Sequence, residues 1–201
     1  MPLLGQNLEV PRCPHCQIDR PNLAAVQFQQ TRDNLSGAIR MWGLYVCARC
    51  GGVVTASAAQ QGQEVQEVFP SPVKVDDELP STAKSYLEQA IASLHAPAGA
   101  VMLAAASVDA MLKSKGYTQG VLNGRINKAA EEHLITPEMA AWAHDIRLDA
   151  NNQRHADTDA VMPSADDARK CIDFAIALGQ FLFALPARVA RGRAAAGTVP
   201  P

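Results

Sequence analysis

Four of the five cysteines fall into two Cys-x-x-Cys pairs, and this pattern constrains the fold more than any other feature of the chain. The first pair is Cys13-Pro-His-Cys16, and the second is Cys47-Ala-Arg-Cys50, which two glycines follow. Each pair forms a turn that aims two thiolates at one point, and two such turns supply the tetrahedral four-sulfur cage that zinc prefers. We therefore predict one structural zinc ion per chain.

The predicted zinc site is closed, because four protein thiolates leave no coordination position for water or substrate. The metal is then expected to stabilise folding and not to do chemistry. The thirty residues between Cys16 and Cys47 are long enough for a strand hairpin, which is the zinc-ribbon arrangement. An iron–sulfur cluster is the alternative centre. His15 has two interpretations, a replacement ligand or a turn residue that faces solvent.

Charge and hydropathy bound the cellular setting. The formal net charge of -2 offers no global attraction for nucleic acid or an anionic membrane, so such a contact would need a local patch. No stretch approaches the roughly 20 apolar residues of a membrane span, and Met1–Pro11 lacks the pattern of a signal peptide. We expect a soluble, cytoplasmic protein with no membrane partner, in which Cys171 is a packed core thiol.

The two parts of the chain differ in their patterns, which predicts an α+β protein. The first part has short runs rich in β-branched and aromatic residues, and the second has apolar residues at helical spacing. The expected strands are Leu23–Gln29, Ala38–Val46, Val53–Ser57 and Glu64–Phe69. The first expected helix starts at Ser81, with Ser81 and Thr82 as its cap, and Pro97 stops it. The other expected helices are 98–115, 121–134, 136–152 and 164–185.

These patterns divide the chain into four regions. Prolines flank an acidic run between the two parts, which indicates an extended connection. The last residues are rich in Arg, Ala, Gly and Pro. We expect a zinc ribbon at 1–70, a linker at 71–80, a bundle of four to five helices at 81–187 and a flexible tail at 188–201.

A polar row marks the fourth expected helix. Arg147, Asn151 and His155 follow at four-residue steps, so they would project from one face if the helix continues. An arginine that holds a phosphate and a histidine that titrates near neutrality are the groups that metal-free RNA cleavage requires. The same row is also an ordinary way to end a helix, with Asn151 as the cap and His155 facing water.

The order of several motifs resembles a known family. The two cysteine pairs are followed by Val68-Phe69-Pro70, Leu79-Pro80, Tyr86-Leu-Glu88-Gln-Ala90 and the Arg147 to His155 row. This order resembles a prokaryotic and phage family that joins a short zinc ribbon to a helical domain of unknown function in the HEPN superfamily. The resemblance covers roughly Pro11–Pro186.

The resemblance implies a HEPN-like bundle of four or five helices that pairs as a homodimer, with the Arg/His rows facing each other. It also implies either a metal-independent endoribonuclease, in toxins or antiviral defence, or an inactive binding module. Under the first alternative Arg147 would hold the scissile phosphate, His155 would be the general base or acid, Asn151 would orient the row, and Asp109 would fix Arg147.

Three functions therefore stay open. The first is a non-enzymatic module that binds nucleic acid or a protein partner in bacterial or phage defence conflict, and the second is a ribonuclease that uses Arg147 and His155. In the third, the ribbon alone recognises the partner through Arg40 and Trp42, and the helices set its spacing in a dimer. Trp42 and Tyr45 could stack on bases or form the ribbon core.

Overall fold

The structure is a computed structural model that describes residues 2–35, 37–71, 73–144 and 162–197. The chain divides into two compact units, Met1–Lys74 and Val75–Pro201. We call these the ribbon unit and the helical unit. The division falls within the region expected to be a linker.

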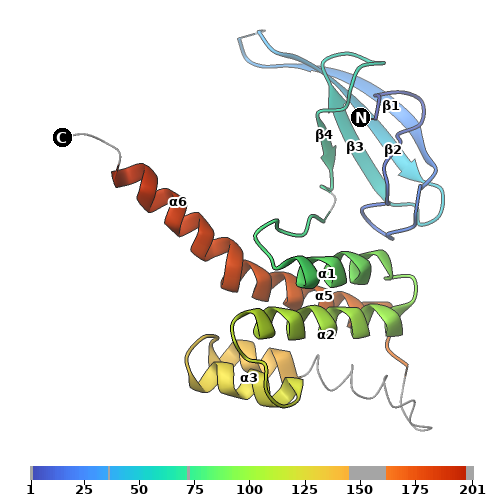
Figure 1. The fold of residues 1–201 in the computed structure, drawn as a ribbon. Coiled ribbons are helices and arrows are strands. Elements are labelled where there is room, and N and C mark those ends of the chain that lie inside the picture. Colours follow the sequence, from blue (N-terminus) through green and yellow to red (C-terminus); the bar gives the residue numbers. More distant parts are fainter. Residues whose placement is uncertain (1, 36, 72, 145–161, 198–201) are drawn as a thin grey trace. The chain divides into compact units, whose positions relative to one another are not determined.

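The ribbon unit is built on one antiparallel sheet with the strand order β1-β2-β3-β4 (Figure 1). The strands follow the β-prone runs, with ends that differ by a few residues from the expectation. Their bounds are β1 Leu23–Arg32, β2 Ile39–Cys47, β3 Val53–Ala58 and β4 Glu67–Phe69. β4 is shorter than predicted, since Glu64 forms only an isolated bridge with Leu3.

The ribbon core lies on one face of the sheet and includes the segment before the first cysteine. Tyr45 of β2 is fully buried, and its hydroxyl group donates a hydrogen bond of 2.9 Å to the carbonyl of Gly5. Leu4 and Leu8 are also buried, and the Leu8 N–H bonds the carbonyl of Leu23 at 3.0 Å. The N-terminal residues therefore cover the core face.

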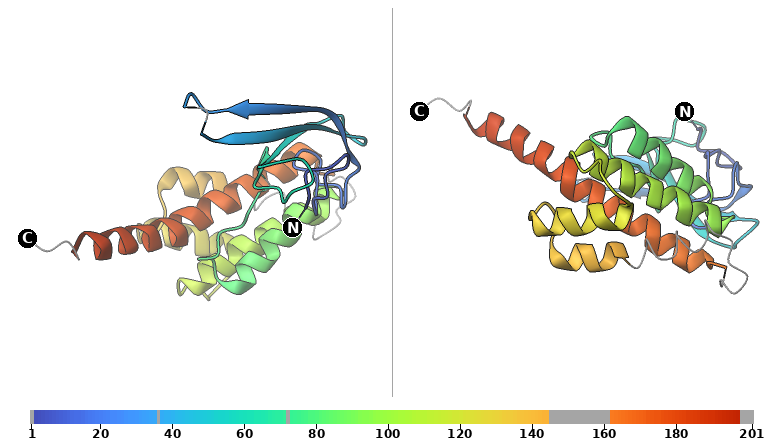
Figure 2. Two further views of the ribbon diagram at one scale, coloured as in Figure 1. Left: turned by 90° about the horizontal axis from the view of Figure 1, so that it is seen from above. Right: turned by 60° about the horizontal axis from the view of Figure 1, so that its bottom comes forward.

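The helical unit packs three long helices around an apolar core (Figures 1 and 2). The elements are α1 Ser81–Ala92, α2 Pro97–Ser114, α3 Leu122–Glu131, α5 Ala165–Gly179, the π-helix η1 Gln180–Ala184 and α6 Leu185–Gly197. Small residues let α1 and α2 approach closely, and the buried Ser107 hydroxyl group donates to the carbonyl of Ala83 at 2.7 Å. Cys171 is 1% exposed in this core, as predicted.

Helix ends show which local signals operate. Gly116 has a φ of 98° just after α2, and Thr136 accepts a bond of 3.2 Å from the N–H of Met139 at the start of the helix at residues 137–144. The predicted cap of α1 by Ser81 and Thr82 is wrong, because Pro80 occupies the N-cap position and no side chain caps the helix.

Two regions differ from the expected division. Leu79, placed in the linker, is 6% exposed and belongs to the helical core, where it packs against Gly179. Residues 188–197, expected to be a flexible tail, continue the last helix as α6. Alanine and arginine favour helix, and Arg191 forms an ion pair with Glu78.

One helical stretch of the described chain, Ala165–Gly197, is long and apolar enough to cross a membrane by length and composition alone. A core helix of a soluble protein meets the same test. Phe174, Ala175 and Leu178 of this stretch are buried in the bundle, so a soluble protein fits the finding.

Candidate metal centre

The four paired cysteines come together in the ribbon unit. Their Sγ atoms all lie within 4.8 Å of one another, and none forms a disulfide. The Sγ atoms of Cys13 and Cys50 are 3.9 Å apart. Tetrahedral zinc, with Zn–S bonds of about 2.3 Å, requires S···S separations of about 3.8 Å. The four cysteines are therefore close enough to hold a metal ion, and their chemistry is compatible with zinc.

The first cysteine turn is held by its own backbone. The N–H of Cys13 donates to the carbonyl of Ile18 at 3.1 Å, and the N–H of Gln17 donates to the carbonyl of Cys13 at 3.0 Å. Gln17 has a φ of 59°, which non-glycine residues rarely adopt. Its side chain Nε2 donates to Pro14 at 3.3 Å. These bonds aim the thiols of Cys13 and Cys16 in one direction.

The second turn repeats this pattern at the end of β2. The N–H of Cys47 donates to the carbonyl of Gly52 at 3.0 Å, and the N–H of Gly51 donates to the carbonyl of Cys47 at 2.8 Å. Gly51 has a φ of 70° and takes the place that Gln17 has in the first turn. The N–H of Gly52 also lies 3.4 Å from the Sγ of Cys50 and donates to it. The hairpin of β1 and β2 brings the two turns together, as the cysteine spacing predicted.

The thiols differ in acidity. Loss of solvation and the neighbouring thiols raise the pKa of Cys50 to about 12, and burial raises the pKa of Cys13. Burial works in the same direction at Cys47, but the backbone N–H groups of Cys50 and Arg49, with the thiols of Cys13 and Cys50, lower its pKa to about 7. Four thiols this close do not all lose their protons unless a cation balances the charge.

His15 is exposed, as the turn interpretation expects, but it also joins the two turns, which neither interpretation anticipated. Its Nε2 lies 2.8 Å from the carbonyl oxygen of Val53, so the nitrogen carries the proton and donates. The ring lies over Gly52, where an added Cβ would be 2.6 Å from the His15 Cγ. A glycine is needed here for space. No local sequence signal distinguishes this contact from an exposed turn.

The four-cysteine cluster forms part of a small core. Cys13 and Cys47 are buried among the core residues of the ribbon unit, Cys16 is half-buried and Cys50 is exposed. The buried apolar residues of this unit number ten, cysteines included, among those the structure describes. A unit with so few apolar contacts generally needs a metal or a disulfide for stability.

The opposite face of the sheet carries aromatic and aliphatic side chains. We call Trp42, Leu44, Val53 and Phe69 the outer face, since strand alternation places them opposite Tyr45. The rings of Trp42 and Phe69 are 6.1 Å apart, and the Trp42 Nε1 donates to the Thr31 hydroxyl at 3.0 Å. Val53 is 47% exposed and Phe69 is 45% exposed. Trp42 is thus half-buried outside the core. Of the two residues that could stack on bases or form the ribbon core, Tyr45 is the one that lies in the core.

An ion pair borders this outer face. The Arg40 Nη1 lies 3.1 Å from the Glu67 Oε2, which also accepts a bond of 3.2 Å from the Ser57 hydroxyl. The charge of Arg40 is therefore balanced on the sheet.

The predicted polar row is outside the described residues. Arg147, Asn151 and His155 all fall in the segment 145–161. Asp109 is described: it forms an ion pair with Arg125 of α3, and its Oδ2 lies 2.6 Å from the Lys113 Nζ. Asp109 thus joins α2 to α3.

Arg125 connects this pair to the loop before α3. Its side chain is 11% exposed, and its Nη2 donates to the carbonyls of Gly120 at 2.6 Å and Thr118 at 3.3 Å. The sequence contains no pattern that singles out Arg125, because the contact joins elements that are separate along the chain.

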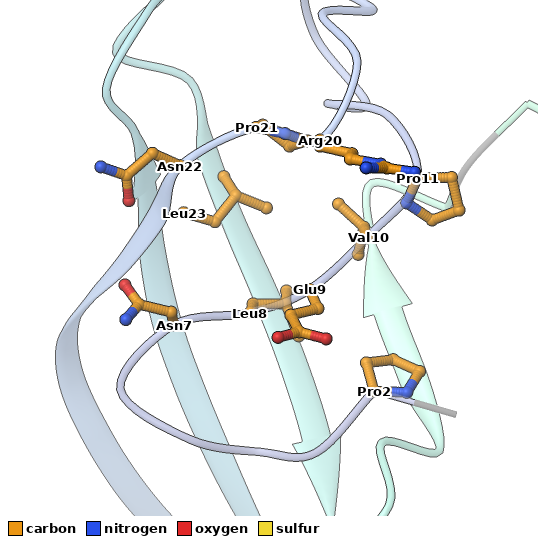
Figure 3. A pocket seen from close by; sticks show the side chains of 10 residues that line it. All are labelled: Pro2, Asn7, Leu8, Glu9, Val10, Pro11, Arg20, Pro21, Asn22 and Leu23. Atoms are coloured by element: carbon orange, nitrogen blue, oxygen red, sulfur yellow. The ribbon is translucent and has the colours of Figure 1, made fainter.

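An open pocket of 710 Å³ lies beside the N-terminal segment of the ribbon unit (Figure 3). Figure 3 shows Asn7 and Asn22 on one side and Pro2 on the other. Glu9 and Arg20 contribute one charge of each sign. The pocket therefore offers no net charge and no cluster of metal ligands to attract a particular ligand.

The fold and the cysteine cluster define a two-unit α+β protein with a candidate four-thiol metal centre. The helical part matches the family model of a domain of unknown function, DUF4145, over residues 88–194, and the chain belongs to this family. No curated protein and no solved structure matches the chain.

Proposed function

We propose that the chain is a non-enzymatic binding module in which one structural zinc ion folds the ribbon unit. The observation that carries this proposal is the enclosure of four thiols within 4.8 Å of one another. A metal with four thiolate ligands has no open position for water or substrate. The zinc therefore acts through folding, and the ribbon unit presents its outer face to a partner.

The chemistry of the outer face favours a protein over a nucleic acid as that partner. Trp42 and Phe69 supply the aromatic surface typical of protein interfaces. The positive charges of the ribbon unit are nearly balanced by its acidic residues, and a zinc-tetrathiolate centre adds two negative charges. The basic residues are Arg12, Arg20, Arg32, Arg40, Arg49 and Lys74, and the acidic residues are Glu9, Asp19, Asp33, Glu64 and Glu67.

The likeness of the motif order to zinc-ribbon and HEPN-like proteins supports the wider setting of this proposal. In it, the helical unit is a HEPN-like bundle that pairs as a homodimer in the cytoplasm, and the chain acts in bacterial or phage defence conflict. Neighbouring genes with defence or mobile-element functions would agree with this setting.

Photo-crosslinking tests the partner class. A photoreactive phenylalanine analogue at Leu44, introduced in cells that naturally express the chain, should give one dominant crosslinked protein. The crosslink should disappear when Trp42→Ala is added, and it should persist with Val121→Ala, which changes an exposed apolar residue of the helical unit. Crosslinks to RNA or DNA in place of protein would overturn the choice of partner.

The alternative is a metal-independent endoribonuclease that uses Arg147 and His155. The spacing of this row in the sequence is the observation that favours it. Labelled RNA is incubated with the zinc-loaded protein in buffer without added divalent ions, beside His155→Ala. The binding module predicts no cleavage by either protein. Cleavage that His155→Ala abolishes would replace the proposal with the ribonuclease.

A further inference from the structure

The last helix of the helical unit extends beyond the bundle. None of the residues of α6 is buried, and Figures 1 and 2 show it continuing away from α1 and α2. The most apolar 18-residue window of Ala165–Gly197 is only 33% buried. An isolated helix of this length is marginal in water, and apolar surface of this kind commonly marks an interaction site.

A groove of 530 Å³ runs along the continuous helix formed by α5, η1 and α6, and Asp76 borders it. Ala177, Phe181, Ala184 and Leu185 recur at helical spacing in its floor, beside the exposed Gln180. Phe181 is 39% exposed and Leu185 is 49% exposed. The alanines leave room for another helix to approach closely. We call this surface the α5–α6 face.

Opposite charges stand at the two ends of this face. Asp173 is exposed one turn before Ala177, and no ion pair is formed by it within the part of the chain that the structure describes. Arg188 and Arg191 line the other end of the groove, where Arg191 also pairs with Glu78. The π-helix η1 lies midway between Asp173 and Arg191 along the chain.

This arrangement is self-complementary when two copies run antiparallel. With η1 of one copy over η1 of the other, Asp173 of each copy lies level with Arg191 of the other. Within one copy these two residues are about 27 Å apart along the helix at 1.5 Å per residue. A parallel pair would bring the arginines together and cost affinity. The apolar floors would cover each other in the middle, which is the hydrophobic centre expected of an interface.

We propose that the α5–α6 face binds the same face of a second copy of the chain in an antiparallel arrangement. The occupant is a second copy because this pairing sets the exposed Asp173 of each copy level with Arg188 and Arg191 of the other. An anionic lipid surface or a nucleic acid would meet Asp173 and Asp76 as well as Arg188 and Arg191, so the acidic residues would offset its attraction to the arginines. The proposal rests on the homodimer of the proposed function, and it adds the surface through which the two copies would pair.

The mass of the protein in solution tests the proposal. It is measured by sedimentation velocity of the full zinc-loaded chain at several protein concentrations. The wild type should sediment at about twice the chain mass of 21.4 kDa. Leu185→Glu should weaken the dimer by about a hundredfold or more, because it places an unpaired charge in the apolar centre. Val121→Glu is the matched control: it changes an exposed apolar residue at the start of α3 and should leave the dimer intact.

Charge reversal tests the orientation. Asp173→Arg and Arg191→Asp should each weaken the dimer by about tenfold, and the double variant should recover most of the loss, because the pair is restored with the charges exchanged. Circular dichroism checks that each variant keeps its helix content. Failure of the double variant to recover any affinity would overturn the antiparallel arrangement.

Two further outcomes would overturn the proposal. A wild-type chain that sediments as a monomer shows that no second copy covers this face, and binding of that monomer to anionic vesicles would identify a lipid surface instead. A dimer unchanged by Leu185→Glu shows that the copies pair elsewhere. In that case the homodimer of the proposed function stands, and only this face is excluded.

Discussion

The Nε2 atom of His15 donates a hydrogen bond of 2.8 Å to the carbonyl of Val53, so the first cysteine turn is tied directly to the strand that leaves the second. The same ring occupies the space above Gly52. The two cysteine turns are thus joined by a protein contact that does not depend on a metal, and this contact can be tested separately from metal binding.

Gly52→Ala should weaken zinc binding through His15. The new Cβ would lie 2.6 Å from the His15 Cγ, so the ring must move and lose its bond to Val53. Overpacking of this kind costs roughly 1–3 kcal/mol, and because folding and metal binding are linked, the apparent zinc affinity should fall by about tenfold. Competition with a chromogenic chelator measures the affinity.

Gly51→Ala is the matched control for this clash. Nothing lies within 4 Å of its added Cβ, but its φ of 70° costs a side chain about 1 kcal/mol. In a His15→Ala background, Gly52→Ala should therefore lower the zinc affinity much less than it does in the wild type. Gly51→Ala should lower the zinc affinity equally in both backgrounds. Equal effects of Gly52→Ala in both backgrounds would contradict the steric role of His15.

Cys13→Ser should abolish stoichiometric zinc and unfold the ribbon unit. Cys13 is fully buried in the ribbon core, so its loss removes a ligand where no other thiol can replace it. The helical unit has a separate core, and most of its helical circular dichroism should remain. Cys171→Ala, which removes the thiol of that other core, should leave the metal content unchanged. Metal analysis by mass spectrometry measures both, and a full zinc content in Cys13→Ser would contradict the four-thiol site.

Asp109→Asn should destabilise the helical unit by roughly 2 kcal/mol, because Arg125 is largely buried and loses its charged partner. Urea unfolding followed by circular dichroism measures the change. Asp166→Asn offers the comparison, since Asp166 pairs with Lys170 at an exposed site where such pairs contribute little. Similar small losses in the two variants would show that Asp109 does not hold α2 to α3.

Asp167 should titrate below its ordinary range. The Ser164 side chain and backbone N–H donate to its carboxylate in the capping box of α5, which lowers the pKa of Asp167 from 3.8. Because the pKa of Asp167 is lower in the folded state, the cap contributes its full stability at a pH above the unfolded-state pKa. This contribution is lost as the pH falls through the folded-state pKa of Asp167.

Nuclear magnetic resonance can follow the Asp167 carboxyl carbon as the pH is lowered. Ser164→Ala removes the first of the two donors and should move the midpoint upward, towards the ordinary value. A midpoint that Ser164→Ala leaves in place would show that the cap does not set it.

The ribbon was largely predictable because its signals are local. The spacing of Cys13, Cys16, Cys47 and Cys50 predicted both the metal cluster and the hairpin between its halves. The role of His15 was not predictable, since its partner Val53 lies far along the chain. The predicted Arg147, Asn151 and His155 row is outside the described residues, and it stays a prediction.

In the helical unit, too, some features were predictable from the sequence and others were not. Apolar periodicity placed α1, α2, α3 and α5, but it did not extend the last helix through α6. Residues 188–197 contain one large apolar residue, Val189, so the sequence shows no apolar repeat there. Burial of Leu79 was missed for a related reason. Its flanking proline indicated a connection, and only packing against Gly179 makes it part of the core.

By itself, the sequence determined where metal ligands, strands and most helices occur, because these depend on residues a few positions apart whose geometry the backbone restricts. Tertiary structure alone decided that His15 closes over Gly52, that Asp109 joins Arg125, and that the N-terminal segment covers the ribbon core. Those contacts join distant residues, and their free energy arises only when the folded chain removes water from between them.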